Sequence, residues 1–144
     1  MMRNRWAILL AAALAQTTFA EPAAKNAEVN GVVSMEAESY TSQLGYVRVG
    51  NANASGGAAM RADGGSDSKL DFRFTVQQAG TWYVWVRAYA TANENNGFRL
   101  GLDGAVKGDI YLKKIGWSWT PEWLRGESHS GPVTVTLSAG THTL

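Results

Sequence analysis

The sequence predicts an all-β fold, a sandwich or a barrel, because apolar and polar residues alternate in several short segments. The alternation is clearest in residues 69–76, 97–103 and 133–138, where an apolar side chain occupies every second position. A period of two places alternate side chains on opposite faces of a strand, so that one set faces a core and the other faces water.

Turn-forming residues divide the chain into closely spaced segments, which is typical of a sandwich or a barrel. We expect strands at residues 32–40, 46–49, 58–62, 69–77, 81–90, 97–103, 133–138 and 141–144. The dipeptide Asp103-Gly104 predicts a tight hairpin, because both residues tolerate a positive φ. Residues 81–90 carry bulky side chains on both faces, which predicts a central strand covered on both sides, with its aromatic residues in the core.

The first twenty residues have the order of a secretory signal peptide. Arg3 and Arg5 precede an apolar run over residues 6–15, and small residues follow at 18–20. The alternative is an N-terminal membrane anchor, against which Glu21 and Pro22 interrupt the apolar run. We therefore expect a secreted or periplasmic protein with a signal peptide at 1–20, a linker at 21–30 and one domain at 31–144.

Charge and cysteine content exclude several classes of function. The chain has 13 basic and 12 acidic residues, and loss of Arg3 and Arg5 would leave a net charge of −1. Without a basic stripe or a basic amphipathic helix, we expect neither a nucleic acid nor a membrane as partner. The absence of cysteine excludes disulfides and thiolate chemistry, although calcium, which prefers oxygen ligands, could stabilise such a domain.

Glu36 and Glu38 form the first candidate site. Residues two apart on a strand face the same way, and two carboxylates so placed repel each other unless a cation or a proton lies between them. The pair could bind calcium, could belong to a solvated strand face, or could be the carboxylate pair of a glycosidase.

Three tryptophans, Trp117, Trp119 and Trp123, form the second candidate site, in a segment that glycine, serine and proline make loop-like. Flat aromatic rings stack on the C–H faces of pyranose rings, and planar polar side chains then fix the orientation of the sugar. The asparagines within residues 93–96 offer such donors and acceptors. The alternative is that they form the turn between two strands. The competing interpretation is that at least one of these tryptophans plugs the end of the sandwich.

No catalytic motif accompanies these residues. His129 and His142 have no nucleophile elbow, zinc-protease motif or phosphate loop near them. We therefore expect no enzymatic activity.

The chain resembles a carbohydrate-binding module of the family six and thirty-five type. The matching segments, in the family's order, are residues 33–40, 55–60, 79–87, 98–104 and 133–144. They span nearly all of the chain after the expected signal peptide.

The resemblance implies a jelly-roll β-sandwich of two antiparallel sheets. It implies that Glu36 and Glu38 bind a structural calcium. It also implies that Tyr46, Asn96, Trp117 and Trp119 contact the sugar. The family's pattern continues past Leu144 into a closing strand with an aspartate that completes the calcium shell, so we expect the last strand to be missing here.

The sequence therefore predicts non-catalytic binding of a polysaccharide or oligosaccharide. Such modules hold an appended or partner enzyme near its substrate, and a catalytic domain would lie outside this sequence. The alternatives are a structural or adhesive sandwich whose tryptophans are all packed and, less well supported, a small glycosidase.

Overall fold

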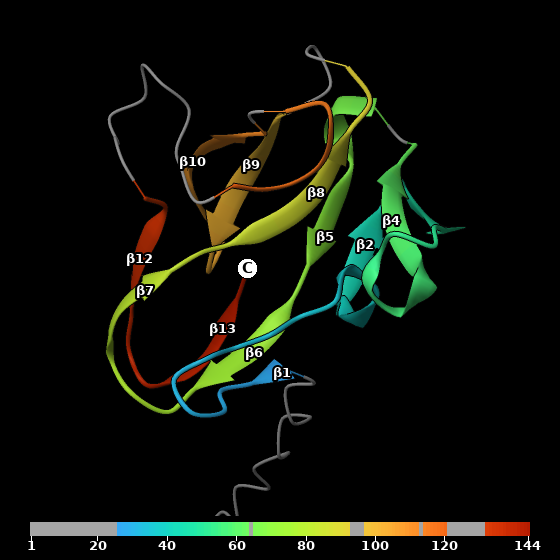
Figure 1. Cartoon of the computed structure of the whole chain (residues 1–144). Helices are drawn as coiled ribbons and strands as arrows, with labels where there is room; N and C mark the ends of the chain where they lie inside the picture. The colour runs from blue at the N-terminus through green and yellow to red at the C-terminus, as the bar shows by residue number, and fades with distance from the viewer. Residues whose placement is uncertain (1–25, 64, 93–96, 113, 121–131) are drawn as a thin grey trace, which may run out of the picture.

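The computed structural model describes residues 26–63, 65–92, 97–112, 114–120 and 132–144, which form an all-β sandwich (Figure 1). The predicted fold class is confirmed, and the described residues contain no α-helix. The strands are β1 (Asn26–Ala27), β2 (Ser42–Leu44), β3 (Tyr46–Gly50), β4 (Ala58–Ala62), β5 (Lys69–Asp71), β6 (Arg73–Val76), β7 (Gly80–Tyr83), β8 (Val86–Ala90), β9 (Gly97–Leu102), β10 (Ala105–Tyr111), β11 (Gly116–Thr120), β12 (Thr134–Leu137) and β13 (Gly140–Thr143). Three short 3₁₀ turns, η1 (Ala37–Ser39), η2 (Ser55–Gly57) and η3 (Gly65–Asp67), join them.

Two long extended segments organise the sandwich, and each changes its partner midway (Figure 1). In the first, β5 pairs with β2, and after Phe72 the segment continues as β6 between β1 and β13. In the second, β7 pairs with β12, and after Val84 and Trp85 the segment continues as β8 beside β11. All of these pairs are antiparallel except β1 with β6. The breaks allow one segment to take part in two ladders.

The hydrophobic core lies between the inward faces of β6, β9, β10 and β12. Its buried members are Phe74, Val76, Leu100, Leu102, Ile110, Val133, Val135 and Leu137. The predicted alternation is confirmed in β6 and β12, where every second residue is buried, and in the second half of β9, where Leu100 and Leu102 are buried. Trp82, Val84 and Phe98 pack against this cluster while keeping part of their surface exposed.

The expected hairpin at Asp103-Gly104 joins β9 to β10. Both turn residues have positive φ, 51° at Asp103 and 77° at Gly104, which few other residues tolerate. The same turn lies against β13, because the Asp103 N–H donates to the Thr143 carbonyl oxygen at 2.8 Å. The hairpin tip is thus fixed to the last strand of the chain.

The prediction of a strand over residues 32–40 is wrong. These residues form a loop that contains η1, and Val33 and Met35 pack against the core without a ladder partner. The Ser39 N–H and the Ser39 hydroxyl both donate to the Glu36 carbonyl oxygen, at 2.9 and 2.8 Å. A serine that bonds locally in this way favours a turn over a strand.

Part of the expected linker is structured. Asn26–Ala27 forms β1 beside β6, and Asn26 and Glu28 are buried. The Glu28 N–H donates to the Thr75 carbonyl oxygen at 2.8 Å, and the Glu28 carboxylate accepts from the Gln77 N–H at 2.5 Å. The expected signal peptide at 1–20 lies outside the described residues.

Candidate functional site

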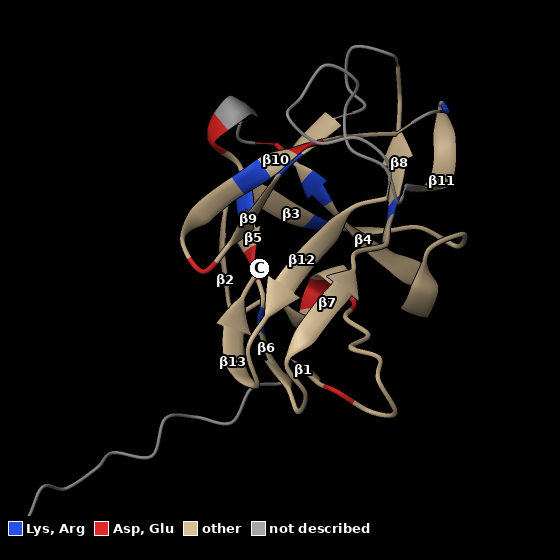
Figure 2. Cartoon of the chain, turned by 90° about the vertical axis from the view of Figure 1, so that its left-hand side faces the viewer, with Lys and Arg blue, Asp and Glu red and all other residues tan. Residues whose placement is uncertain are grey.

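An exposed aromatic surface lies on the ladder of β8 and β11, which run side by side in Figure 2. Trp117 lies opposite Tyr89, and Trp119 lies opposite Arg87. Because alternate strand residues share a face, these four side chains lie on one side of the ladder, and Trp85 extends the row by one step. We call the surface made by Trp85, Arg87, Tyr89, Trp117 and Trp119 the aromatic face.

Trp117 anchors the aromatic face. The Arg87 guanidinium lies over its ring, 4.7 Å from the ring centroid, and the Tyr89 ring meets it edge-on with centroids 5.5 Å apart. Trp117 is half-buried, and its indole nitrogen is buried without a hydrogen-bond partner among the described residues. Trp117 therefore supports its neighbours and offers less of its own surface to a ligand.

Trp85 and Trp119 are the open part of the aromatic face. Their exposed fractions are 58% and 60%, although both belong to, or directly adjoin, a paired strand. Together they line a shallow groove of about 360 Å³. Two exposed indoles that line one groove offer apolar ring faces on which a flat ligand can stack.

Arg87 fixes the aromatic face to a neighbouring loop. Besides lying over Trp117, its guanidinium donates to the Asn53 carbonyl oxygen at 3.0 Å. Asn53 precedes η2, and its own N–H donates to the Asn51 side chain at 2.9 Å. The guanidinium is therefore positioned both by the ladder and by the loop.

Two predictions about this region are wrong. Residues 116–120 form strand β11 and not a loop, and residues 81–90 are not covered on both sides. Ala90 is fully buried, but the opposite face of β8 is open. The physical reason is that β11 pairs with β8 in the same ladder. A neighbouring strand satisfies the backbone hydrogen bonds of β8, but it does not cover the outer face of β8.

Of the four expected sugar-contacting residues, the structure brings Trp117 and Trp119 together. Tyr46 begins β3 in the separate β3–β4 ladder, and burial raises the pKa of its hydroxyl. Asn96, with Trp123, lies outside the described residues. Sequence reasoning missed Trp85, Arg87 and Tyr89 as members of the site. A signal for them existed, since an arginine between two aromatic residues at alternate positions is unusual for a buried face.

The expected calcium ligands do not share a strand face. Glu36 precedes η1 in an extended conformation and is exposed, whereas Glu38 lies inside η1. One carboxylate oxygen of Glu38, Oε1, is buried and has no hydrogen-bond partner in the described part of the chain. A buried carboxylate oxygen without a partner is costly, and a cation would remove that cost. No group of three histidine, aspartate or glutamate side chains suited to a metal occurs among the described residues.

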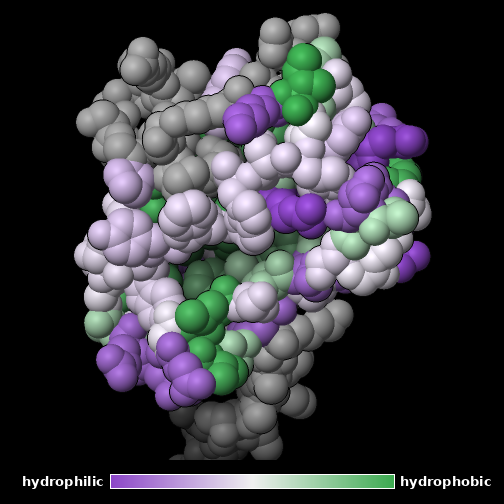
Figure 3. Space-filling view, in the orientation of Figure 1, coloured by the Kyte–Doolittle hydropathy of each residue, from purple (hydrophilic) through white to green (hydrophobic). Residues whose placement is uncertain are grey.

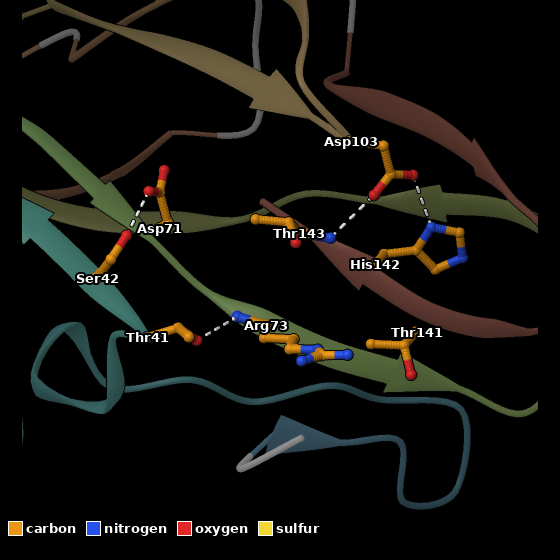
Figure 4. A pocket seen from close by; sticks show the side chains of 8 residues that line it. All are labelled: Thr41, Ser42, Asp71, Arg73, Asp103, Thr141, His142 and Thr143. Carbon is orange, nitrogen blue, oxygen red and sulfur yellow. Dashed lines mark hydrogen bonds and ion pairs between the residues drawn. The ribbon is translucent and has the colours of Figure 1, made fainter. Parts of the chain in front are cut away.

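A second, polar cavity of about 430 Å³ lies where β6, β13 and the β9–β10 turn meet (Figure 4). It is lined by Thr41, Ser42, Asp71, Arg73, Asp103, Thr141, His142 and Thr143. The Ser42 hydroxyl donates to Asp71 at 2.5 Å, and Lys69 lies 3.1 Å from the same carboxylate. The Ser42 hydrogen bond lowers the pKa of Asp71, burial opposes this, and Lys69 adds to the lowering.

His142 makes hydrogen bonds through both ring nitrogens at this cavity. Nδ1 lies 2.7 Å from Asp103 Oδ2, and Nε2 lies 2.9 Å from the Ser138 carbonyl oxygen. Because a carboxylate and a carbonyl oxygen are both acceptors, these two contacts favour the imidazole with a proton on each nitrogen, which is the cation. The hydrogen bond to Asp103 raises the pKa of His142, burial lowers it, and the Ser138 carbonyl raises it further.

The Asp103 carboxylate is the counterpart of this cation. Burial has the largest single effect on the pKa of Asp103 and raises it. Hydrogen bonds from His142 and the Thr143 N–H lower this pKa, and so do the charges of His142 and Lys107. Together they outweigh burial, so the pKa lies below its ordinary value. An imidazole with both nitrogens engaged cannot accept a proton from a substrate. This pair therefore joins the β9–β10 turn to β13 and is unsuited to general base catalysis.

Neither a protein-family model nor a curated protein matches the chain. Among the described residues no helix is long and apolar enough to cross a membrane.

Proposed function

We propose that this protein is a non-catalytic carbohydrate-binding domain whose aromatic face stacks on the sugar rings of a polysaccharide. The observation that carries the proposal is the pair Trp85 and Trp119, two adjacent indoles that are more than half exposed on a paired ladder. Burying such rings in the core would stabilise the fold, so their joint exposure supports a role in binding a ligand.

The surface around the rings fits a sugar better than an aliphatic partner. On the face that Figure 3 shows, hydrophobic residues form separate areas among near-neutral and hydrophilic ones. Indoles combine an apolar face with a polar edge, and Arg87 supplies N–H donors beside them. Stacking together with directed hydrogen bonds is the combination that recognises pyranose rings.

The test is binding of soluble oligosaccharides to single-site variants, measured by calorimetry and by quenching of tryptophan fluorescence. Stacking on one ring contributes roughly 1–3 kcal/mol, so Trp119→Ala and Trp85→Ala should each weaken binding about tenfold or more. The matched control is Trp82→Ala, which removes an indole that packs against the core. If no oligosaccharide or polysaccharide binds, the structural or adhesive alternative is favoured; turnover of chromogenic glycosides would favour the glycosidase.

We also propose that the protein is secreted and that it holds an appended or partner enzyme near the same polysaccharide. It rests on the basic and apolar order of the first twenty residues and on the family resemblance. Mass spectrometry of exported protein should show a mature chain that begins at Glu21.

Calcium is proposed as a structural cofactor at Glu36 and Glu38. The buried, unpartnered Oε1 of Glu38 supports a cation there, while Glu36 is free to turn toward it from an exposed position. Bound calcium would stabilise the fold by about 2.7 kcal/mol at a hundredfold excess over its Kd. Thermal unfolding with calcium and with chelator measures this, and Glu38→Gln should abolish the difference. Equal melting temperatures in both conditions would exclude the site.

A further inference from the structure

The guanidinium of Arg87 is a positioned cation at the centre of the aromatic face. Among the described residues it contacts the Trp117 ring, 4.7 Å away, and the Asn53 carbonyl oxygen at 3.0 Å. Neither of these carries a negative charge. A guanidinium has five N–H donors, and the carbonyl uses only one of its amino groups, so most of this capacity is left for a ligand.

Two other described arginines are neutralised by a carboxylate. Arg61 makes two hydrogen bonds to Asp63, both at 2.8 Å, and Arg99 bonds to Asp109 across the β9–β10 ladder at 2.9 Å. Arg87 has no carboxylate within salt-bridge distance among the described residues, and neither β8 nor β11 contains an acidic residue (Figure 2). The charge of Arg87 is thus held in place, with no counter-ion in the part of the chain that the structure describes.

The register places this charge beside the stacking surface. Arg87 is the direct cross-strand neighbour of Trp119, and such neighbours have Cβ atoms about 4.5–5.5 Å apart. Trp85 lies two residues before Arg87 on the same side. A sugar ring stacked on either indole would carry its ring substituents to the edge where the guanidinium lies.

We propose that Arg87 makes the aromatic face selective for acidic polysaccharides, in which a carboxylate or a sulfate ester on the sugar pairs with the guanidinium. This inference rests on the proposed function, because it assumes that the rings stack on sugar. A guanidinium pairs with carboxylate or sulfate oxygens through two parallel N–H donors, which gives direction as well as attraction. A sugar stacked on the indoles would displace water from the edge of the guanidinium and so strengthen the ion pair.

The experiment uses two matched pairs of polymers, each differing only in charge. They are polygalacturonate with its carboxyl-reduced form, and a sulfated galactan with its desulfated form. Affinity electrophoresis and calorimetry give the Kd of the full chain for each polymer. We expect the wild-type protein to bind at least one charged polymer about tenfold more tightly than its neutral form, since hydrogen bonds to charged groups are the stronger class. This preference should shrink as salt is raised.

Three variants separate charge from stacking. Arg87→Gln should bind charged and neutral polymers with the affinity that the wild type shows for the neutral one, and Arg87→Lys should keep part of the preference. Trp119→Ala should weaken the binding of charged and neutral polymers by the same factor. The matched control is Arg61→Gln, which removes an exposed arginine that already pairs with Asp63 and should leave the preference unchanged.

The outcomes distinguish this inference from the function on which it rests. Binding of charged and neutral polymers with equal affinity, or a preference that survives Arg87→Gln, overturns the selectivity and leaves sugar binding intact. Equal loss of preference in Arg61→Gln also overturns it, because the effect would then follow net charge. Absence of binding to all four polymers overturns the selectivity. The proposed function itself is overturned if the soluble oligosaccharides also fail to bind, or if sedimentation shows that the aromatic face joins two copies of the chain.

Discussion

Trp82 and Trp85 stand three residues apart in one extended segment and have opposite surroundings. Trp82, in β7, packs against the hydrophobic core, whereas Trp85 is 58% exposed and lines the groove of the aromatic face. Between them the segment leaves its ladder with β12 and joins the ladder with β11. One stretch of sequence therefore serves the core at one end and the surface at the other.

Residue type alone therefore does not decide whether a tryptophan of this molecule packs in the core or lies on the binding surface. Alternation predicts which side chains share a face of a strand. Whether that face is buried depends on the tertiary packing of other elements against it. The inward faces of β6 and β12 meet across the core, whereas the outer face of β8 contacts the loop at Asn53 through Arg87 and leaves Tyr89 exposed. Stability and recognition should therefore be separable by substitution.

The largest effect is expected in the core. Phe74→Ala removes a buried ring that also lies 5.7 Å from the His142 ring, centroid to centroid. Such a truncation leaves a cavity and should lower the free energy of unfolding by about 3–5 kcal/mol. Urea denaturation followed by circular dichroism measures the loss. A change below about 1 kcal/mol would mean that this end of the sandwich is less tightly packed than its burial indicates.

Much of the fold could be predicted because local pattern and tertiary packing agree. The turn at Asp103-Gly104 is determined by two residues that tolerate positive φ, and the alternation around Val135 matches its buried face. Strand β10 was not predicted, because the register shifts between Val106 and Gly108 and the alternation is lost. The strand expected near Glu36 failed for the opposite reason: the pattern was present, but Ser39 closes a turn there.

The site was less predictable than the fold. Trp119 was identified by its type and by its neighbours in sequence, although Gly116 and Ser118 suggested a loop and the structure has a strand. Trp85 and Arg87 join it only through the pairing of β8 with β11, which no local pattern reveals. The Asp103–His142 contact joins positions 39 residues apart and could be found only from the structure.

A smaller and pH-dependent effect is expected where Asp103 meets His142. The pKa of His142 is raised above its ordinary 6.5, so its contribution to stability is complete below pH 6.5 and is lost as the pH rises through the folded-state pKa. The pKa of Asp103 is lowered below its ordinary 3.8, so its contribution is present above pH 3.8 and is lost as the pH falls through the folded-state pKa. The pair should stabilise the fold most between these two ordinary values.

Asp103→Asn tests this pair without disturbing the turn, because asparagine also tolerates a positive φ. An asparagine amide can donate to Nδ1, which would allow His142 to become neutral while Nε2 keeps its bond to Ser138. The variant should lose about 1–2 kcal/mol near pH 5, and less above pH 8. Proton NMR of the His142 ring should show titration above pH 6.5 in the wild type only. Titration below 6.5 in the wild type would contradict the cationic assignment.

The smallest effect on stability is expected at the aromatic face, and it completes the comparison. Trp119→Ala removes a ring that is 60% exposed and should change the free energy of unfolding by no more than about 0.5 kcal/mol. Trp82→Ala should cost about 3 kcal/mol, since that ring packs against the core. Both variants delete one indole, so a difference between them reflects surroundings alone. Parallel urea titrations measure it, and equal losses would mean that the fold depends on Trp119 as much as on Trp82, which would favour the structural role over the sugar platform.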